Sequence, residues 1–170
     1  MTGIKTGILD WTGDNPFIYL KTDPEQDWSS LSLYFRIASS EYGSGHAILV
    51  VDNPYQAGSD NDTRLLITDH QPLAEYLVRD FVRHFGLFRK AVALDSLKII
   101  SDGVFHTVNH YPEVVTESVS SSSANLKVEM QWHNMSQPAI CVDLPQDQTQ
   151  TQKHEMMCVF HPAQHARVLV

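Results

Sequence analysis

Two segments of this chain alternate apolar and polar residues with a period of two, and this pattern constrains the fold more than any other feature. The first runs from Ser30 to Ser39 and the second from Leu126 to His133. Successive side chains of a β-strand point to opposite faces of its sheet, so each segment predicts a strand with one apolar and one polar face. Such strands are typical of antiparallel sheets.

Further strand candidates are short apolar segments bounded by turn-forming residues. They are Gly7 to Trp11, Phe17 to Lys21, His46 to Asp52, Arg64 to Thr68, Leu97 to Ile100, Val104 to His110, Glu113 to Val119, Pro138 to Asp143 and His154 to Phe160. The serine-rich stretch at 120–125 predicts the loop of a hairpin between two of these strands. Many short strands of this kind predict a barrel or a barrel-like sandwich.

One segment, Pro72 to Phe85, has apolar residues at helical spacing and charged residues on the opposite side. It predicts an amphipathic α-helix of about four turns. Pro72 fits the first turn of this helix, and Gly86 is placed to end it in a left-handed conformation. The apolar stripe requires a surface to cover, and we expect the helix to pack on the sheet.

These elements predict a single domain over residues 1–170, because a chain of this length builds one substantial core. The expected fold is mainly β, an antiparallel β-barrel or barrel-like sandwich with one amphipathic α-helix packed on it. In length and strand content the chain is similar to lipocalin-like (calycin-like) barrels and to flavin-binding split barrels. That likeness concerns the fold and carries no function.

The composition restricts the partners that this chain can bind. Twelve Lys and Arg against twenty Asp and Glu give a formal net charge of −8. Nucleic acids and anionic membranes need a concentrated positive surface, so we expect neither as a partner. The first residues have neither a basic leader followed by a long apolar stretch nor a small-residue cleavage site, so we expect no secretory signal. Only two cysteines occur, which favours a reducing cytoplasm. The apolar C-terminal run of residues 167–170 allows a homodimer.

Nine histidines in a chain with few basic residues are the feature that invites a catalytic interpretation. His106 and His110 share one face of a predicted strand, and His154 shares its face with apolar residues of another. We expect these two faces to meet around a pocket in the barrel interior. Neutral imidazole both donates and accepts protons near pH 7, so His106, His110 and His154 are the predicted catalytic residues. The structural alternative is that they are core or rim histidines.

Three further residues are predicted to contact a substrate. Tyr34 and Arg36 would offer a phenol donor and a fixed positive charge suited to an enolate or a carboxylate, if their face turns inward. Trp132 could stack on a flat ligand. The histidines at 154, 161 and 165 match no metal-binding signature, and nucleotide-binding motifs are absent. We therefore expect no metal and no cofactor.

The sequence supports three hypotheses about function. The first is a small-molecule-binding β-barrel of the cytoplasm, acting on an apolar substrate as a cofactor-independent lyase, isomerase or cyclase through histidine acid–base chemistry. The second is an FMN-dependent oxidoreductase of split-barrel type. The third is a non-enzymatic protein-interaction module, which would dock a partner on the helix stripe or on an exposed sheet edge.

Overall fold

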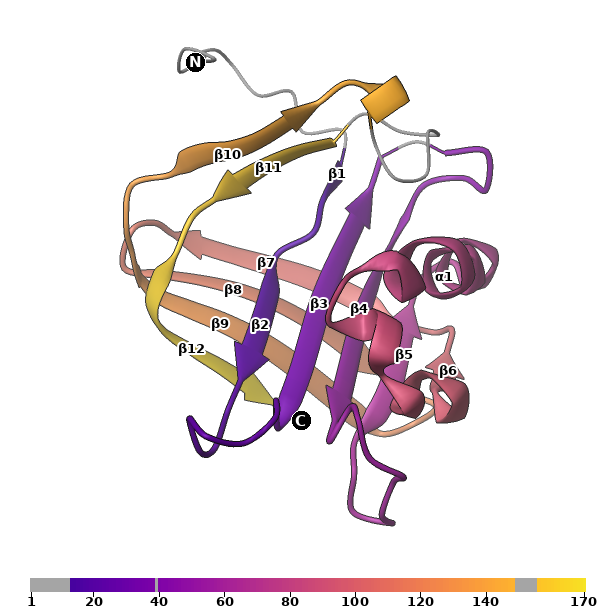
Figure 1. Cartoon of the computed structure of the whole chain (residues 1–170). Coiled ribbons are helices and arrows are strands. Elements are labelled where there is room, and N and C mark those ends of the chain that lie inside the picture. The colour runs from indigo at the N-terminus through magenta and orange to yellow at the C-terminus, as the bar shows by residue number, and fades with distance from the viewer. Residues whose placement is uncertain (1–12, 39, 149–155) are drawn as a thin grey trace.

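The computed structural model describes residues 13–38, 40–148 and 156–170. Its fold is mainly β, as predicted, and all strand pairs but one are antiparallel. Figure 1 shows two large sheets facing each other, with their strands crossing at a steep angle. The strands are β1 (Gly13–Asp14), β2 (Phe17–Leu20), β3 (Ser30–Ile37), β4 (Gly45–Asp52), β5 (Arg64–Thr68), β6 (Lys98–Ile100), β7 (Val104–His110), β8 (Val114–Ser121), β9 (Leu126–Met135), β10 (Ala139–Leu144), β11 (Met156–Phe160) and β12 (Ala163–Leu169).

The first large sheet has the strand order β1-β3-β4-β5-β6, and β2 also pairs with β3. We call it sheet A. Its strands β5 and β6 are parallel because the chain crosses between them through the helical region, which begins with α1 (Gln71–Tyr76). A parallel pair needs such a crossover, whereas antiparallel neighbours can be joined by a short turn. The helical region lies over one face of sheet A (Figure 1).

The second large sheet, sheet B, has the order β12-β9-β8-β7. Strands β8 and β9 form the predicted hairpin, and Asn125 in its loop has a φ of 47°, a value that asparagine tolerates better than most residues. Strands β10 and β11 pair separately. The predicted, mainly antiparallel β fold is confirmed. The hydrogen-bonded order of the described strands does not close a barrel, so the barrel form is not confirmed.

The core has two parts, one on each face of sheet A. Leu33, Phe35 and Leu49 belong to the part between sheet A and the helical region. Tyr34 and Ile48 belong to the part between the two sheets, which also contains Met130 of sheet B. Both faces of β3 are therefore covered. Alternate residues of β3 therefore form two buried faces. The more polar of these faces packs against sheet B.

The predicted helix forms over its expected length but is irregular. α1 continues as a π-helical turn over Leu77–Phe81 and a 3₁₀ turn over Val82–His84. Further 3₁₀ turns follow at Phe88–Lys90 and Val92–Ser96. The prediction that Gly86 ends the helix in a left-handed conformation is wrong: Gly43 is the glycine with positive φ in the described chain. Phe85 ends the helix instead by becoming extended, which lets its ring pack on the core.

The predicted strands are found at their expected places wherever the structure describes them, with ends that differ by a few residues. The strand expected at Gly7 to Trp11 lies outside the described residues. The only sequence signal for strand β12 was the apolar run of residues 167–170. No helix within the described residues is long and apolar enough to cross a membrane.

Candidate functional site

Polar residues gather at one end of the layer between the two sheets. Arg36 of β3 lies directly opposite His46 of β4, on the face of sheet A that meets sheet B. Asp69 follows the end of β5 and reaches the same place. Sheet B contributes side chains from β7 and β8. We call this group the rim, and it consists of Arg36, His46, Asp69, Phe105, Thr107 and Glu117.

Arg36 joins the two sheets through its guanidinium group. One guanidinium nitrogen, Nη2, donates to Glu117 Oε1 at 3.0 Å, to Thr107 Oγ1 at 2.9 Å and to Tyr34 Oη at 3.2 Å. The Thr107 hydroxyl also donates to Glu117 Oε2 at 2.6 Å. The Glu117 side chain is only 5% exposed, against 31% for Arg36. A carboxylate buried to this degree requires a cation and hydrogen-bond donors, and the rim supplies both.

His46 and Asp69 form a closely held pair. The backbone N–H of His46 donates to Asp69 Oδ1 at 2.7 Å, and His46 Nδ1 lies 2.7 Å from Asp69 Oδ2. Because an ionised carboxylate only accepts, Nδ1 carries the proton in this contact, and Nε2 of a neutral ring is then the basic nitrogen. Both side chains are about one-third exposed, at 34% and 35%. The ring is oriented by the carboxylate and still reaches solvent.

Two aromatic rings form the apolar wall beside His46. Phe105 stacks on the imidazole with ring centroids 5.2 Å apart. Phe105 also contacts the buried Tyr34 edge-on, with centroids 6.0 Å apart. The rim thus lies where the apolar layer between the sheets meets solvent. A small-molecule site has this combination of an apolar wall and a few oriented polar groups.

Close packing behind the rim fixes Asp69. A Cβ atom added at Gly45 would lie 2.8 Å from Asp69 Oδ1 and 2.8 Å from His70 Cβ. The backbone of β4 therefore approaches Asp69 more closely than a side chain would permit. His70 is held as well, because its Nδ1 accepts from the backbone N–H of Leu73 and caps α1. Glycine at position 45 is needed for the geometry of the His46–Asp69 pair.

The structure places the functional residues predicted from the sequence in different parts of the molecule. Tyr34 and Arg36 do face inward, and they meet at the rim. Trp132 is a core residue of the layer between the sheets, where its Nε1 donates to the carbonyl of Phe17 at 3.1 Å. His154 lies outside the described residues. Of the three predicted contact residues, Arg36 therefore belongs to the rim and Tyr34 lies beside it.

His106 and His110 do not line an interior. They share a face of β7 with Val104 and Val108, as predicted, but this face points away from the core, and both histidines are exposed. The opposite face of β7, with Phe105 and Thr107, is the one that meets sheet A. The expectation of a histidine-lined pocket is therefore corrected at these two positions. Alternation placed the residues on one face but did not reveal which face was inner.

Sequence reasoning did not single out His46 and Asp69. Both stand at strand ends that were predicted, His46 at the start of one strand and Asp69 just after another. Their contact depends on the register between β4 and β5, which pairs Ala47 with Thr68. A histidine immediately before a continuous apolar strand is the only local signal for this site. Pairing that histidine with a residue 23 positions away required the structure.

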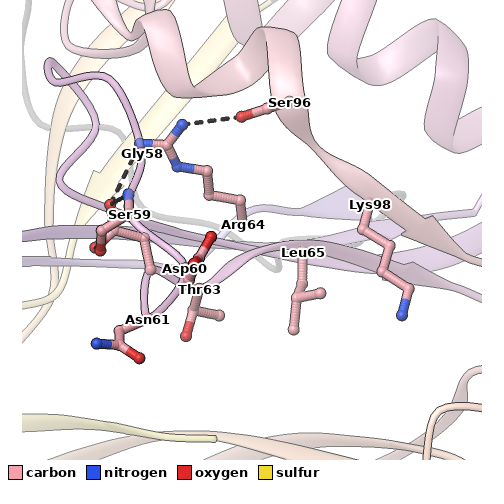
Figure 2. A pocket seen from close by; sticks show the side chains of 10 residues that line it. Gly58, Ser59, Asp60, Asn61, Thr63, Arg64, Leu65, Ser96 and Lys98 are labelled. Atoms are coloured by element: carbon pink, nitrogen blue, oxygen red, sulfur yellow. Dashed lines mark hydrogen bonds and ion pairs between the residues drawn. The ribbon is translucent and has the colours of Figure 1, made fainter.

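A polar depression lies near the other end of β5, away from the rim (Figure 2). Arg64 points toward Ser96, while Leu65 and Lys98 point the opposite way. The Arg64 guanidinium donates to Ser96 Oγ at 2.9 Å and to the Gln56 carbonyl at 3.0 Å, and it also pairs with Asp62. Hydrogen bonds from the Ser59 backbone and Asn53 hold the pKa of Asp62 below its usual value. Apart from Arg64 Nε, which is buried without a hydrogen-bond partner among the described residues, these groups already satisfy one another. The loop is therefore better explained as a structural clamp.

The described residues contain no group of three or more His, Cys, Asp or Glu side chains placed to hold a metal ion. No protein-family model, curated protein or solved structure matches the chain. The geometry of the rim is therefore the basis for assigning a function.

Proposed function

We propose that the protein binds a small, largely apolar molecule at the rim and that His46 exchanges a proton with it. The observation that carries this proposal is the 2.7 Å contact between His46 Nδ1 and Asp69 Oδ2, with the ring stacked on Phe105 and still open to solvent. A carboxylate that fixes the orientation and tautomer of an imidazole makes the other nitrogen an effective general base. The setting we propose is the cytoplasm.

The charges at the rim favour a neutral substrate. Arg36 is the only Lys or Arg in this group, and Glu117 neutralises it, while Asp69 adds a second carboxylate. A ligand that arrives as an anion would meet net negative charge here, so the carboxylate site expected around Arg36 has lost its support. An enolate that forms by transfer of a proton to His46 would instead lie beside the imidazolium formed in the same step. A neutral molecule with an acidic C–H or a hydroxyl group can instead donate to His46 Nε2.

The reaction class that fits is a cofactor-independent proton transfer, as in isomerisation, cyclisation or elimination. His46 would accept the proton through Nε2, and Asp69 would stabilise the imidazolium that forms. Phe105 and Tyr34 would provide the apolar wall. The rim does not support the flavin-dependent alternative. Arg36 is the one Lys or Arg among the rim residues, and it is already paired with Glu117.

The test uses neutral probes, because the natural ligand is unknown. A panel of cyclic ketones and aromatic alcohols is titrated into ¹⁵N-labelled protein and followed by NMR. We expect amide shifts centred on His46, Phe105 and Thr107. His46→Gln should weaken binding about 10-fold, the loss of roughly 1.4 kcal/mol. His84→Gln changes an exposed histidine in the helical region and is the matched control.

Proton transfer is measured separately as exchange of the ketone α-hydrogens in D₂O. Wild-type protein should accelerate the exchange, and His46→Gln should lower the rate about 100-fold, the usual contribution of a positioned general base. Asp69→Asn should reduce the rate while preserving binding. Probe shifts that map elsewhere, or equal exchange rates in wild type and His46→Gln, would overturn the proposal.

A further inference from the structure

Strand β7 is an open edge of sheet B. The hydrogen-bonded order places it last, with β8 on one side and no partner strand on the other among the described residues. Figure 1 shows it as the outermost strand of that sheet. Five of its seven residues are exposed, and Val104 is 68% exposed. An edge of this length presents a row of backbone N–H and C=O groups to any chain that can pair with it.

This edge lacks the devices that normally prevent such pairing. Charged side chains, proline, bulges or very short strands protect most edges. Edge strand β6 has only three residues and carries Lys98, and edge strand β12 carries Arg167. By contrast, β7 reads Val-Phe-His-Thr-Val-Asn-His, without Asp, Glu, Lys, Arg or Pro. Its pairing with β8 is also regular over all seven residues.

We propose that β7 is a dimerisation edge and that its partner is β7 of a second copy of this chain. In an antiparallel pairing about a two-fold axis, each residue lies opposite itself or a near neighbour in its own sequence. A fixed charge on such a strand would therefore face its own copy, and β7 contains no Asp, Glu, Lys or Arg. The chain as a whole is acidic, yet this exposed strand has no Asp, Glu, Lys or Arg. A strand that pairs with its own copy needs such a composition.

The register with the greatest overlap places the axis at Thr107, the middle residue of β7. His106 then lies opposite Val108 of the second copy, and Val104 lies opposite His110, all on the exposed face. Phe105 lies opposite Asn109 on the inner face. Side chains keep their faces, so the two four-stranded sheets join into one continuous sheet.

The strength of this association follows from its size. One added strand buries less than the roughly 1,200 Å² that stable complexes bury, so the dimer should be weak and dependent on concentration. Sedimentation velocity over roughly a hundred-fold range of protein concentration is the measurement. The mass of wild-type protein should move from one chain toward two. A single-chain mass at every concentration would overturn the proposal.

Substitutions then locate the interface. Val108→Lys places a charge on β7, near its own copy across the axis, and should weaken dimerisation at least 10-fold. Thr116→Lys is the matched control, because Thr116 lies directly beside Val108 on the interior strand β8 and faces the same side. It should leave the dimer unchanged within two-fold. Equal loss in both variants, or no loss in Val108→Lys, would overturn the assignment to the edge.

Charge reversal tests the self-pairing directly. Val108→Glu alone should also be monomeric, and mixing it with Val108→Lys should restore a one-to-one dimer. Circular dichroism checks that each variant folds, and Val104→Lys, at a position of β7 that is 68% exposed, replaces Val108→Lys if that variant does not fold. A mixture that stays monomeric while wild type dimerises would refute pairing of β7 with β7.

Discussion

The ion pair between Arg36 and Glu117 should stabilise the contact between the two sheets. Arg36→Met keeps the apolar part of the side chain and removes the charge, which leaves the Glu117 carboxylate, 5% exposed, with Thr107 as its remaining partner. Removing one partner of a fully buried pair costs about 3–5 kcal/mol. Because Arg36 is 31% exposed, water can partly replace it, and we expect about 2–3 kcal/mol.

A double-mutant cycle measures the coupling. Glu117→Gln should cost about 1 kcal/mol, because it leaves a guanidinium that solvent still reaches. The double variant should be less destabilised than the sum of the two single variants, by about 1–2 kcal/mol. In a chain of this size, the Arg36→Met loss corresponds to a fall in Tm of about 5–10 °C. Urea denaturation and thermal unfolding, both followed by circular dichroism, provide the measurements.

The matched control is the exposed pair of Lys127 and Glu129 on the outer face of sheet B. Its atoms are closer, at 2.7 Å, but Lys127 is 62% exposed. Lys127→Met should therefore change stability by less than about 0.5 kcal/mol, although the contact is shorter. Equal effects of Lys127→Met and Arg36→Met would refute the reasoning, because burial and not distance is expected to set the magnitude.

Three further predictions concern other parts of the fold. Gly45→Ala should displace Asp69, cost about 1–3 kcal/mol and shift the NMR signals of the His46 ring; unchanged ring signals would contradict the packing at the rim. Hydrogen bonds from Ser121 and Ser123 lower the pKa of Asp102. The Asp102 carboxylate therefore contributes fully to stability when the pH is above its unfolded-state pKa of about 4. This contribution is lost as the pH falls through the lower pKa of the folded state. Ser121→Ala should raise that pKa and move acid unfolding to higher pH, which a series of melts at different pH values would show. The Ser32 hydroxyl is fully buried without a hydrogen-bond partner among the described residues, so Ser32→Ala should be neutral or slightly stabilising in urea denaturation, and a loss above about 1 kcal/mol would reveal a partner.

The sequence predicted the strands well because the period-two alternation is a local property. The segments around Leu33 and Val128 alternate clearly, and both form strands at the predicted positions. The helical segment was equally visible from its apolar spacing. Its π and 3₁₀ turns were not, because they depend on how Phe85 and its neighbours pack against sheet A.

The candidate site was predictable only in part. Tyr34 and Arg36 share a face that sequence alone could assign either to solvent or to the interior. The structure buries it because a second sheet covers it. His46 and Asp69 meet through strand register, which no local pattern specifies. For His106 and His110, the shared face was right and its direction was wrong, since the alternate residues Phe105 and Thr107 turn toward sheet A.

The burial of both faces of β3 explains why the polar residues of this chain gather where they do. A strand buried on both faces usually reads as a continuous apolar run, yet β3 keeps Ser32, Tyr34 and Arg36 on its inner face. Leu31 to Phe35 are all buried, and the Ser32 hydroxyl has no hydrogen-bond partner among the described residues. The two larger polar groups of this face must find partners within the layer or at its end. The Tyr34 hydroxyl and the Arg36 guanidinium do so by converging with Glu117. The rim is thus the place where a polar strand face leaves the core and reaches solvent.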